Sequence, residues 1–115
     1  MASRPTDIIE PRHLKFLGEQ DGEPERELKR KLIPILEGAG DIRAAYLVIA
    51  DYRDGSSPSV VLCLHSEKGD DPVIVSRIGK IFSEVFNAKE HLDLLFMDSV
   101  KESAVRAVCS PFYVR

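Results

Sequence analysis

His65 is the side chain in this sequence best suited to acid–base chemistry, because histidine titrates near neutral pH. It directly follows the apolar run VVLCL at residues 60–64. Asp93, Asp98 and Tyr46 could join it, but catalysis needs a partnered constellation, and no motif places these groups together. We therefore expect His65 to lie at the end of a strand with one ring nitrogen hydrogen-bonded. No catalytic residue is predicted.

Metal and phosphate sites are not indicated by the remaining candidates. Cys63 and Cys109 have no Cys or His neighbour at zinc-ligand spacing, and both are expected to be buried thiols. The acidic segment HSEKGDD lacks the alternating spacing of a calcium loop. The glycines of LEGAGD follow a predicted helix, which is typical of a helix end rather than of a phosphate loop. No cofactor is expected.

Length and composition are those of one soluble domain. The chain has 115 residues, of which 43% are hydrophobic and 30% charged, and its formal net charge is -3. Acidic residues stand beside the basic ones of RELKRK, so we expect no nucleic-acid partner. The apolar runs are far shorter than a membrane-spanning helix, and no secretory signal is recognised at the start. The sequence predicts a cytoplasmic protein with no membrane partner.

Seven elements are expected within a single domain at residues 14–115. Residues 1–13 have two prolines and no clear period, which predicts a flexible arm. Leucines at 28, 32 and 36 indicate an amphipathic helix, and Asp54-Gly55 indicates a hairpin turn. In chain order the expected elements are a strand in 14–20, a helix from Pro24, strands in 42–52 and 57–67, a helix from Pro72, a strand in 91–98, and a last helix that opens with a Ser99–Glu102 capping box and ends before Pro111.

This order predicts an α+β fold. The first six elements match a ferredoxin-like βαββαβ sandwich, in which two helices cover one face of a four-stranded, mainly antiparallel sheet. The last helix is then an addition at the C-terminal end.

Apolar side chains are expected on both faces of this sheet, because the strands do not alternate between apolar and polar residues. Leu47 faces one way, whereas Tyr46 and Val48 face the other. Two helices cover one face, and the last helix, about 17 Å long, is too short to cover the second. Several hundred Å² of apolar surface would stay exposed, which monomers rarely tolerate. We therefore expect a symmetric homodimer.

The expected interface or ligand-binding residues follow from the same alternation. They are Tyr46, Val48, Val61, Cys63 and His65 on the second face, with Phe112 and Tyr113 near the C-terminal end. Pro111 stops the last helix, and the two rings after it are expected to fold back on the sheet as an apolar latch.

Several local features together resemble the C-terminal domain of the SseB family, the bacterial enhanced serine sensitivity proteins. They are FLGEQDGEPERELKRKL, IRAAYLV, the hairpin ending in VVLCLHSE, and the closing PFY, and they span about residues 14–113. The Ala45-Tyr46-Leu47 strand and the terminal Pro-Phe-Tyr weigh most. The family has no established catalytic mechanism, so the resemblance supplies no active-site residues. It implies a binding or regulatory module.

Our leading hypothesis is a noncatalytic regulatory or protein-interaction module that self-associates through the second sheet face and can bind a further protein. One alternative is a domain that senses a small metabolite, such as an amino acid, in a pocket at that face. Another is a small dimeric α+β enzyme that uses His65 with an acidic residue.

Overall fold

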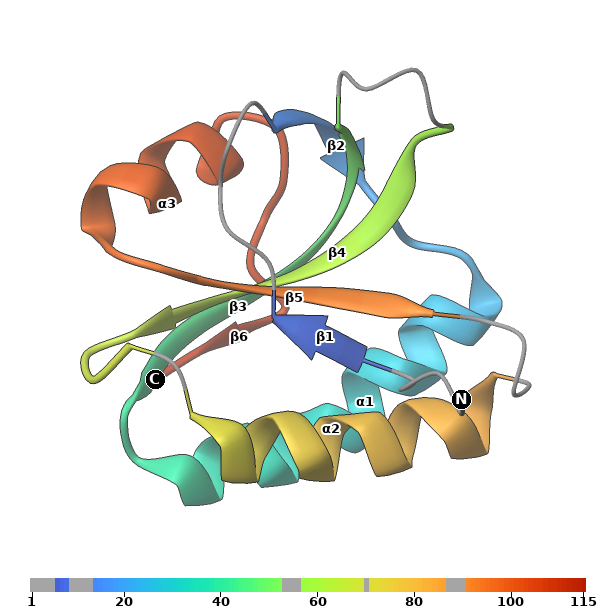
Figure 1. The fold of residues 1–115 in the computed structure, drawn as a ribbon, viewed down its shortest axis with the longest axis vertical. Helices are drawn as coiled ribbons and strands as arrows, with labels where there is room; N and C mark the ends of the chain where they lie inside the picture. The colour runs from blue at the N-terminus through green and yellow to red at the C-terminus, as the bar shows by residue number, and fades with distance from the viewer. Residues whose placement is uncertain (1–5, 9–13, 53–56, 70, 87–90) are drawn as a thin grey trace.

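The computed structural model describes residues 6–8, 14–52, 57–69, 71–86 and 91–115. A mixed sheet forms the middle layer, with α1 and α2 on one face and α3 on the other (Figure 1). The elements are β1 (Thr6–Ile8), β2 (Lys15–Glu19), α1 (Glu23–Ala39), β3 (Ile42–Asp51), β4 (Ser59–Ser66), α2 (Pro72–Val85), β5 (Leu92–Met97), α3 (Ser99–Arg106) and β6 (Tyr113–Val114).

The strand order is β1-β5-β4-β3-β2, and β6 also pairs with β3. β1 and β4 run parallel to β5, whereas β2, β4 and β6 run antiparallel to β3. The predicted α+β class is therefore found, but the ferredoxin-like order is not confirmed and the sheet is mixed. In a split βαβ unit the helix-linked strands are parallel and separated by another strand. Here β2 and β3, which α1 links, are antiparallel neighbours.

The predicted arm and hairpin turn fall partly outside the described residues. Within the arm, Thr6–Ile8 forms the edge strand β1, whereas 1–5 and 9–13 are not described. Residues 53–56, which contain the predicted Asp54-Gly55 turn, also lie outside the described ranges. The strands on either side of that turn pair over nearly their whole length, as expected for a hairpin.

The predicted leucine stripe of α1 is buried. Local signals account for the ends of the helices. α1 ends at Ala39, just before Gly40 with its φ of 75°. Asp71 caps α2 by accepting hydrogen bonds from the backbone N–H groups of Val73 and Ile74. The cap of α3 is Asp98, one residue before the predicted Ser99, and its carboxylate accepts from the Lys101 N–H at 3.0 Å.

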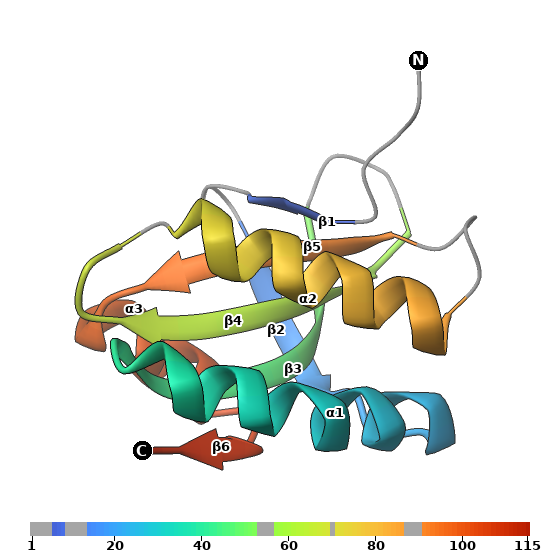
Figure 2. The same ribbon diagram turned by 90° about the horizontal axis from the view of Figure 1, so that it is seen from below.

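A hydrophobic cluster lies on each face of the sheet. The first lies between the sheet and the two helices α1 and α2, which run side by side across this face (Figure 2). The second lies on the opposite face, where Val105 of α3, Cys109 and the half-buried Phe16 pack over the strands. A single chain therefore covers most of the face that the sequence suggested would need a partner.

The closing Pro-Phe-Tyr segment leads into the short strand β6, which begins at its last residue, Tyr113. Tyr113 lies opposite Ala45 of β3, and the Phe112 N–H donates to the Ala45 carbonyl at 2.9 Å. Tyr113 and Phe112 belong to the first cluster, on the α1 side of the sheet. The predicted latch therefore forms at the outer edge of β3 and not across the second face. None of the described helices is both long enough and apolar enough to cross a membrane.

Candidate functional site

Four polar side chains meet on the second face of the sheet, under α3. The Tyr46 hydroxyl donates to Glu102 Oε2 at 2.7 Å and accepts from Arg106 Nε at 3.1 Å. Arg106 Nη2 also donates to Glu102 Oε2 at 3.3 Å. His65 Nδ1 lies 3.1 Å from Glu102 Oε1. The cluster joins β3, β4 and α3, and we call it the Tyr46 network.

The electrostatics of the Tyr46 network favour a structural role. Burial, and next the hydrogen bond to Glu102, raise the pKa of Tyr46 above its usual 10.0, so its hydroxyl remains a donor at neutral pH. The hydrogen bond to Tyr46 raises the pKa of Arg106, which stays charged. Glu102 accepts from Tyr46 and Arg106 on one oxygen and faces His65 with the other. An imidazole beside a carboxylate is also the arrangement that orients a general base, as the enzyme alternative requires.

The structure brings some predicted site residues together and separates others. Tyr46 and His65 belong to the network, while Val48, Val61 and Cys63 pack in the hydrophobic cluster of the same face. Tyr46, Val48, Val61 and Cys63 are 0% exposed. Their role as contacts for a partner or ligand stays a prediction, and it would require α3 to leave the sheet.

The two aspartates considered near His65 lie elsewhere. Asp93 accepts a hydrogen bond from the Tyr52 hydroxyl and lies 2.7 Å from His91 Nε2, while Asp98 caps α3. Sequence reasoning missed Glu102 and Arg106 as functional candidates. Their i,i+4 spacing on one helix face was the available signal, since it puts both side chains on the same side of α3.

The buried thiols have weak nucleophilic character. Burial raises the pKa of Cys63 far above its usual 9.0. Burial, and next the nearby Glu19 carboxylate, raise the pKa of Cys109 to about 11. Both thiols are therefore protonated at neutral pH, as expected for cysteines that act as small hydrophobes. Within the described ranges, no three His, Cys, Asp or Glu side chains are placed to hold a metal ion.

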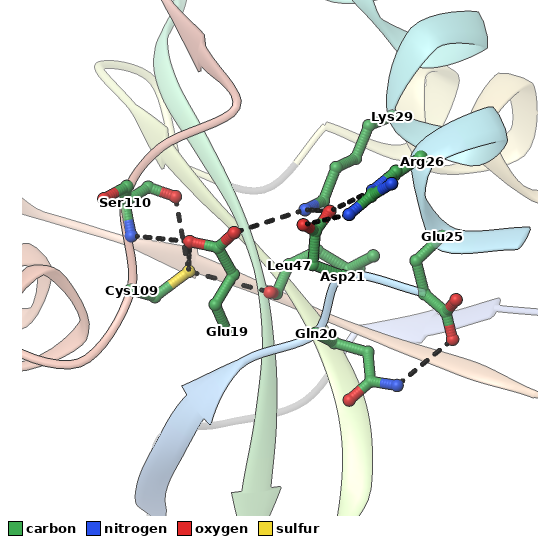
Figure 3. Close-up of polar contacts among 9 residues, drawn as sticks. All are labelled: Glu19, Gln20, Asp21, Glu25, Arg26, Lys29, Leu47, Cys109 and Ser110. Atoms are coloured by element: carbon green, nitrogen blue, oxygen red, sulfur yellow. Dashed lines mark hydrogen bonds and ion pairs between the residues drawn. The ribbon is translucent and has the colours of Figure 1, made fainter. Parts of the chain in front are cut away.

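A second polar cluster joins β2, α1 and the segment after α3 (Figure 3). Glu19 Oε1 accepts from the Ser110 N–H at 3.1 Å, and Glu19 Oε2 lies 3.8 Å from Lys29 Nζ. Lys29 Nζ also donates to Asp21 at 3.1 Å. Cys109 Sγ sits between Glu19 and the Leu47 carbonyl, 3.6 Å from the latter. These contacts hold the chain after α3 against the edge of β3.

An open edge and a groove adjoin the C-terminal strand. The groove has a volume of about 560 Å³ and is lined by Ile33 and Glu37 of α1 and by residues 112–115. It thus contains the predicted site residues Phe112 and Tyr113. The Arg115 N–H donates to the Arg43 carbonyl at 2.9 Å, so the alternation of the ladder points the Val114 N–H and C=O away from β3. The Val114 side chain is 61% exposed.

Comparison with known proteins gives one match. The family model of the SseB protein C-terminal domain matches residues 16–115, which is nearly the whole chain. No curated protein and no solved structure matches the chain.

Proposed function

The chain belongs to the SseB protein C-terminal domain family, and from this premise we propose that it is a noncatalytic protein-interaction module whose partner is a second copy of itself. The observation that carries the proposal is the outer edge of β6, where an exposed Val114 lies beside a groove and no described strand other than β3 pairs with it. Exposed strand edges are the sites where proteins add a further strand.

The edge of β6 replaces the second sheet face as the proposed contact. Of the second-face residues predicted for self-association, Tyr46, Val48, Val61 and Cys63 are buried by their own chain, and the Tyr46 network fastens α3 over them. Exposing these residues would require breaking that network. Pairing at β6 needs no rearrangement, because the backbone groups of Val114 already point outward.

A two-fold axis through Val114 gives a closed dimer. Two β6 strands would pair antiparallel, with each Val114 donating to and accepting from the partner's Val114. This pairing sets the partner's Arg115 opposite Tyr113, on the side of the sheet where Glu37 borders the groove. The described residues form no ion pair with either Glu37 or Arg115 within one chain. Opposite charges on a self-complementary surface therefore support a second copy as the occupant.

The noncatalytic part of the proposal is supported by the Tyr46 network. Its hydroxyl, guanidinium and carboxylate groups hydrogen-bond with one another, which ties α3 to the strands. The two cysteine thiols are held protonated by burial. These groups have structural partners that account for their positions.

Light scattering over a wide range of protein concentration tests the proposal. We expect the wild-type chain to pass from monomer to dimer. Val114→Pro removes the outward N–H but no N–H that bonds to β3, and we expect this variant to remain monomeric. Val114→Thr keeps the branched shape and the N–H, and it should still dimerise. A wild-type monomer at every concentration, or an undiminished Val114→Pro dimer, would contradict the proposal.

A charge exchange tests the predicted orientation. Glu37→Arg places two cations across the interface and should weaken the dimer. Combining Glu37→Arg with Arg115→Glu restores opposite charges and should recover dimerisation. If the double variant associates no better than Glu37→Arg alone, the two residues do not face each other across this interface.

A further inference from the structure

A small cavity lies at one end of the first helical layer, where α1 begins and α2 ends. Its volume is about 120 Å³. Leu28, Leu47 and Leu92 form buried walls, and the stacked rings of Phe82 and Phe86, with centroids 4.7 Å apart, form another. An engineered apolar cavity of about 150 Å³ holds benzene, so this volume suits a group of roughly four to six non-hydrogen atoms.

The polar lining of the cavity includes an unsatisfied carboxylate oxygen. Glu25 lines the cavity, and its Oε1 accepts from Gln20 Nε2 at 3.1 Å. Its Oε2 is buried, and no described residue gives it a hydrogen bond. A buried acceptor without a partner is costly, and native proteins rarely leave one unexplained. A bound group that donates to Oε2 would explain it.

The charged groups around the cavity indicate which kind of ligand could donate a hydrogen bond to Glu25 Oε2. Besides Glu25, the lining contains His91, whose Nε2 lies 2.7 Å from the Asp93 carboxylate. The Glu25 carboxylate in this lining favours a cation and disfavours a ligand that carries its own carboxylate. The apolar walls require that the rest of the ligand be uncharged.

We propose that this cavity binds a small primary alkylammonium ion, with a short branched tail between Leu28, Leu47 and Leu92 and the ammonium group hydrogen-bonded to Glu25. This site lies on the α1 and α2 side of the sheet and is independent of the β6 edge. It also differs from the second sheet face, where the sequence suggested a metabolite pocket.

Titration with 3-methylbutylammonium, followed by methyl NMR, tests the proposal on the whole chain. We expect saturable shifts of the Leu28, Leu47 and Leu92 methyl signals. The neutral analogue 3-methylbutanol fits the walls but lacks the charge, and it should bind at least about tenfold more weakly. Leucine, which adds a carboxylate, should also bind more weakly than the amine. Saturation with leucine as tight as with the amine would contradict the proposed selectivity.

Three variants distinguish a direct role of the Glu25 carboxylate in binding from an effect on the stability of the fold. Glu25→Gln keeps the shape and removes the charge, so it should weaken amine binding about tenfold. Glu23→Gln is the matched control, because it changes the same charge in the same turn of α1 without lining the cavity. Gly22→Ala leaves the charge but places a Cβ 2.5 Å from Oε2, so the carboxylate must move and binding should weaken.

Several outcomes would overturn the site. They are the absence of saturable shifts in the wild-type chain, shifts confined to residues outside the cavity, and equal amine affinities of the Glu25→Gln and Glu23→Gln variants. The Val114→Pro chain should bind the amine as the wild type does. Loss of amine binding can therefore be distinguished from loss of dimerisation.

Discussion

The Tyr46 hydroxyl shows how one buried polar atom fastens an element to a sheet. Its side chain is 0% exposed, and its hydroxyl bonds to Glu102 and Arg106, both on α3. Removing this hydroxyl leaves Glu102 and Arg106 each short of one hydrogen bond. The hydroxyl therefore adds to the stability that burial of the aromatic ring provides.

Tyr46→Phe should therefore lower the free energy of unfolding by about 1–3 kcal/mol, measured by urea denaturation. Tyr113→Phe is the matched control. Tyr113 is also buried, but no hydrogen bond of its hydroxyl to another described residue is found, so its change should be much smaller. Equal losses in the two variants would mean that the Tyr46 network does not stabilise the fold.

The Cys109 thiol gives the protein a measurable dependence on alkaline pH. Its pKa rises on folding from 9.0 to about 11, mainly through burial, so the unfolded chain ionises first. The stability that this thiol contributes is complete below pH 9.0 and is lost as the pH rises to about 11. Cys109→Ala should show a shallower decline of unfolding free energy over this range. Parallel declines in the two proteins would contradict the assignment.

Contacts between residues far apart in the sequence could not be predicted from the sequence alone. Alternation placed Tyr46 on the second face, and that placement is confirmed. Its partner Glu102 lies 56 positions away, and its position three residues after Ser99 predicts only a role in a helix cap. Local spacing located the start of α3 to within one residue, but it carries no information on which helix face will cover which strand.

At the scale of elements, local signals were sufficient for the longer helices and the hairpin. The leucine period of α1 and Pro72 at the start of α2 were enough to predict both helices. β1 and β6 were missed because strands of three and two residues have no period of their own. They form only where the edges of β5 and β3 offer backbone partners.

The end of α1 provides a matched pair of glycine substitutions. Gly40 has a φ of 75°, so Gly40→Ala should destabilise the protein by about 1 kcal/mol. Gly38 lies within the helix, and a Cβ there meets nothing within 4 Å, so Gly38→Ala should stabilise by about 0.5–1 kcal/mol. Thermal unfolding of both variants measures the two shifts. Changes of the same sign would contradict this description of the helix end.

For the whole molecule, the sequence predicted the α+β class and the layers but not the order of the strands within the sheet. Apolar residues on both faces were recognised correctly, yet the chain itself covers the second face. The same element order is compatible with several strand orders, and long-range pairing decides among them. Here β3 pairs with β2, β4 and β6, which excludes the arrangement in which another strand separates β2 from β3.

Substitutions at two neighbouring residues of β4 test whether each face of the sheet is shielded from water in solution. Val61 and Leu62 point to opposite faces, and both are 0% exposed. Leu62→Ala should destabilise by about 2–5 kcal/mol and Val61→Ala by about 1–3 kcal/mol. A loss well below about 1 kcal/mol for Val61→Ala would mean that the second face is open to water. Urea denaturation of both variants provides the comparison.

The position of β6 has a consequence for biosynthesis. During translation β2, β3 and β4 leave the ribosome early, but the half of the β3 edge at Ala44 and Ala45 has no strand beside it until Tyr113 and Val114 have been made. Glu19 likewise waits for Ser110, 91 positions later. A nascent chain halted before these residues emerge would expose an incomplete sheet to chaperones, and the domain can close only after Val114 has emerged.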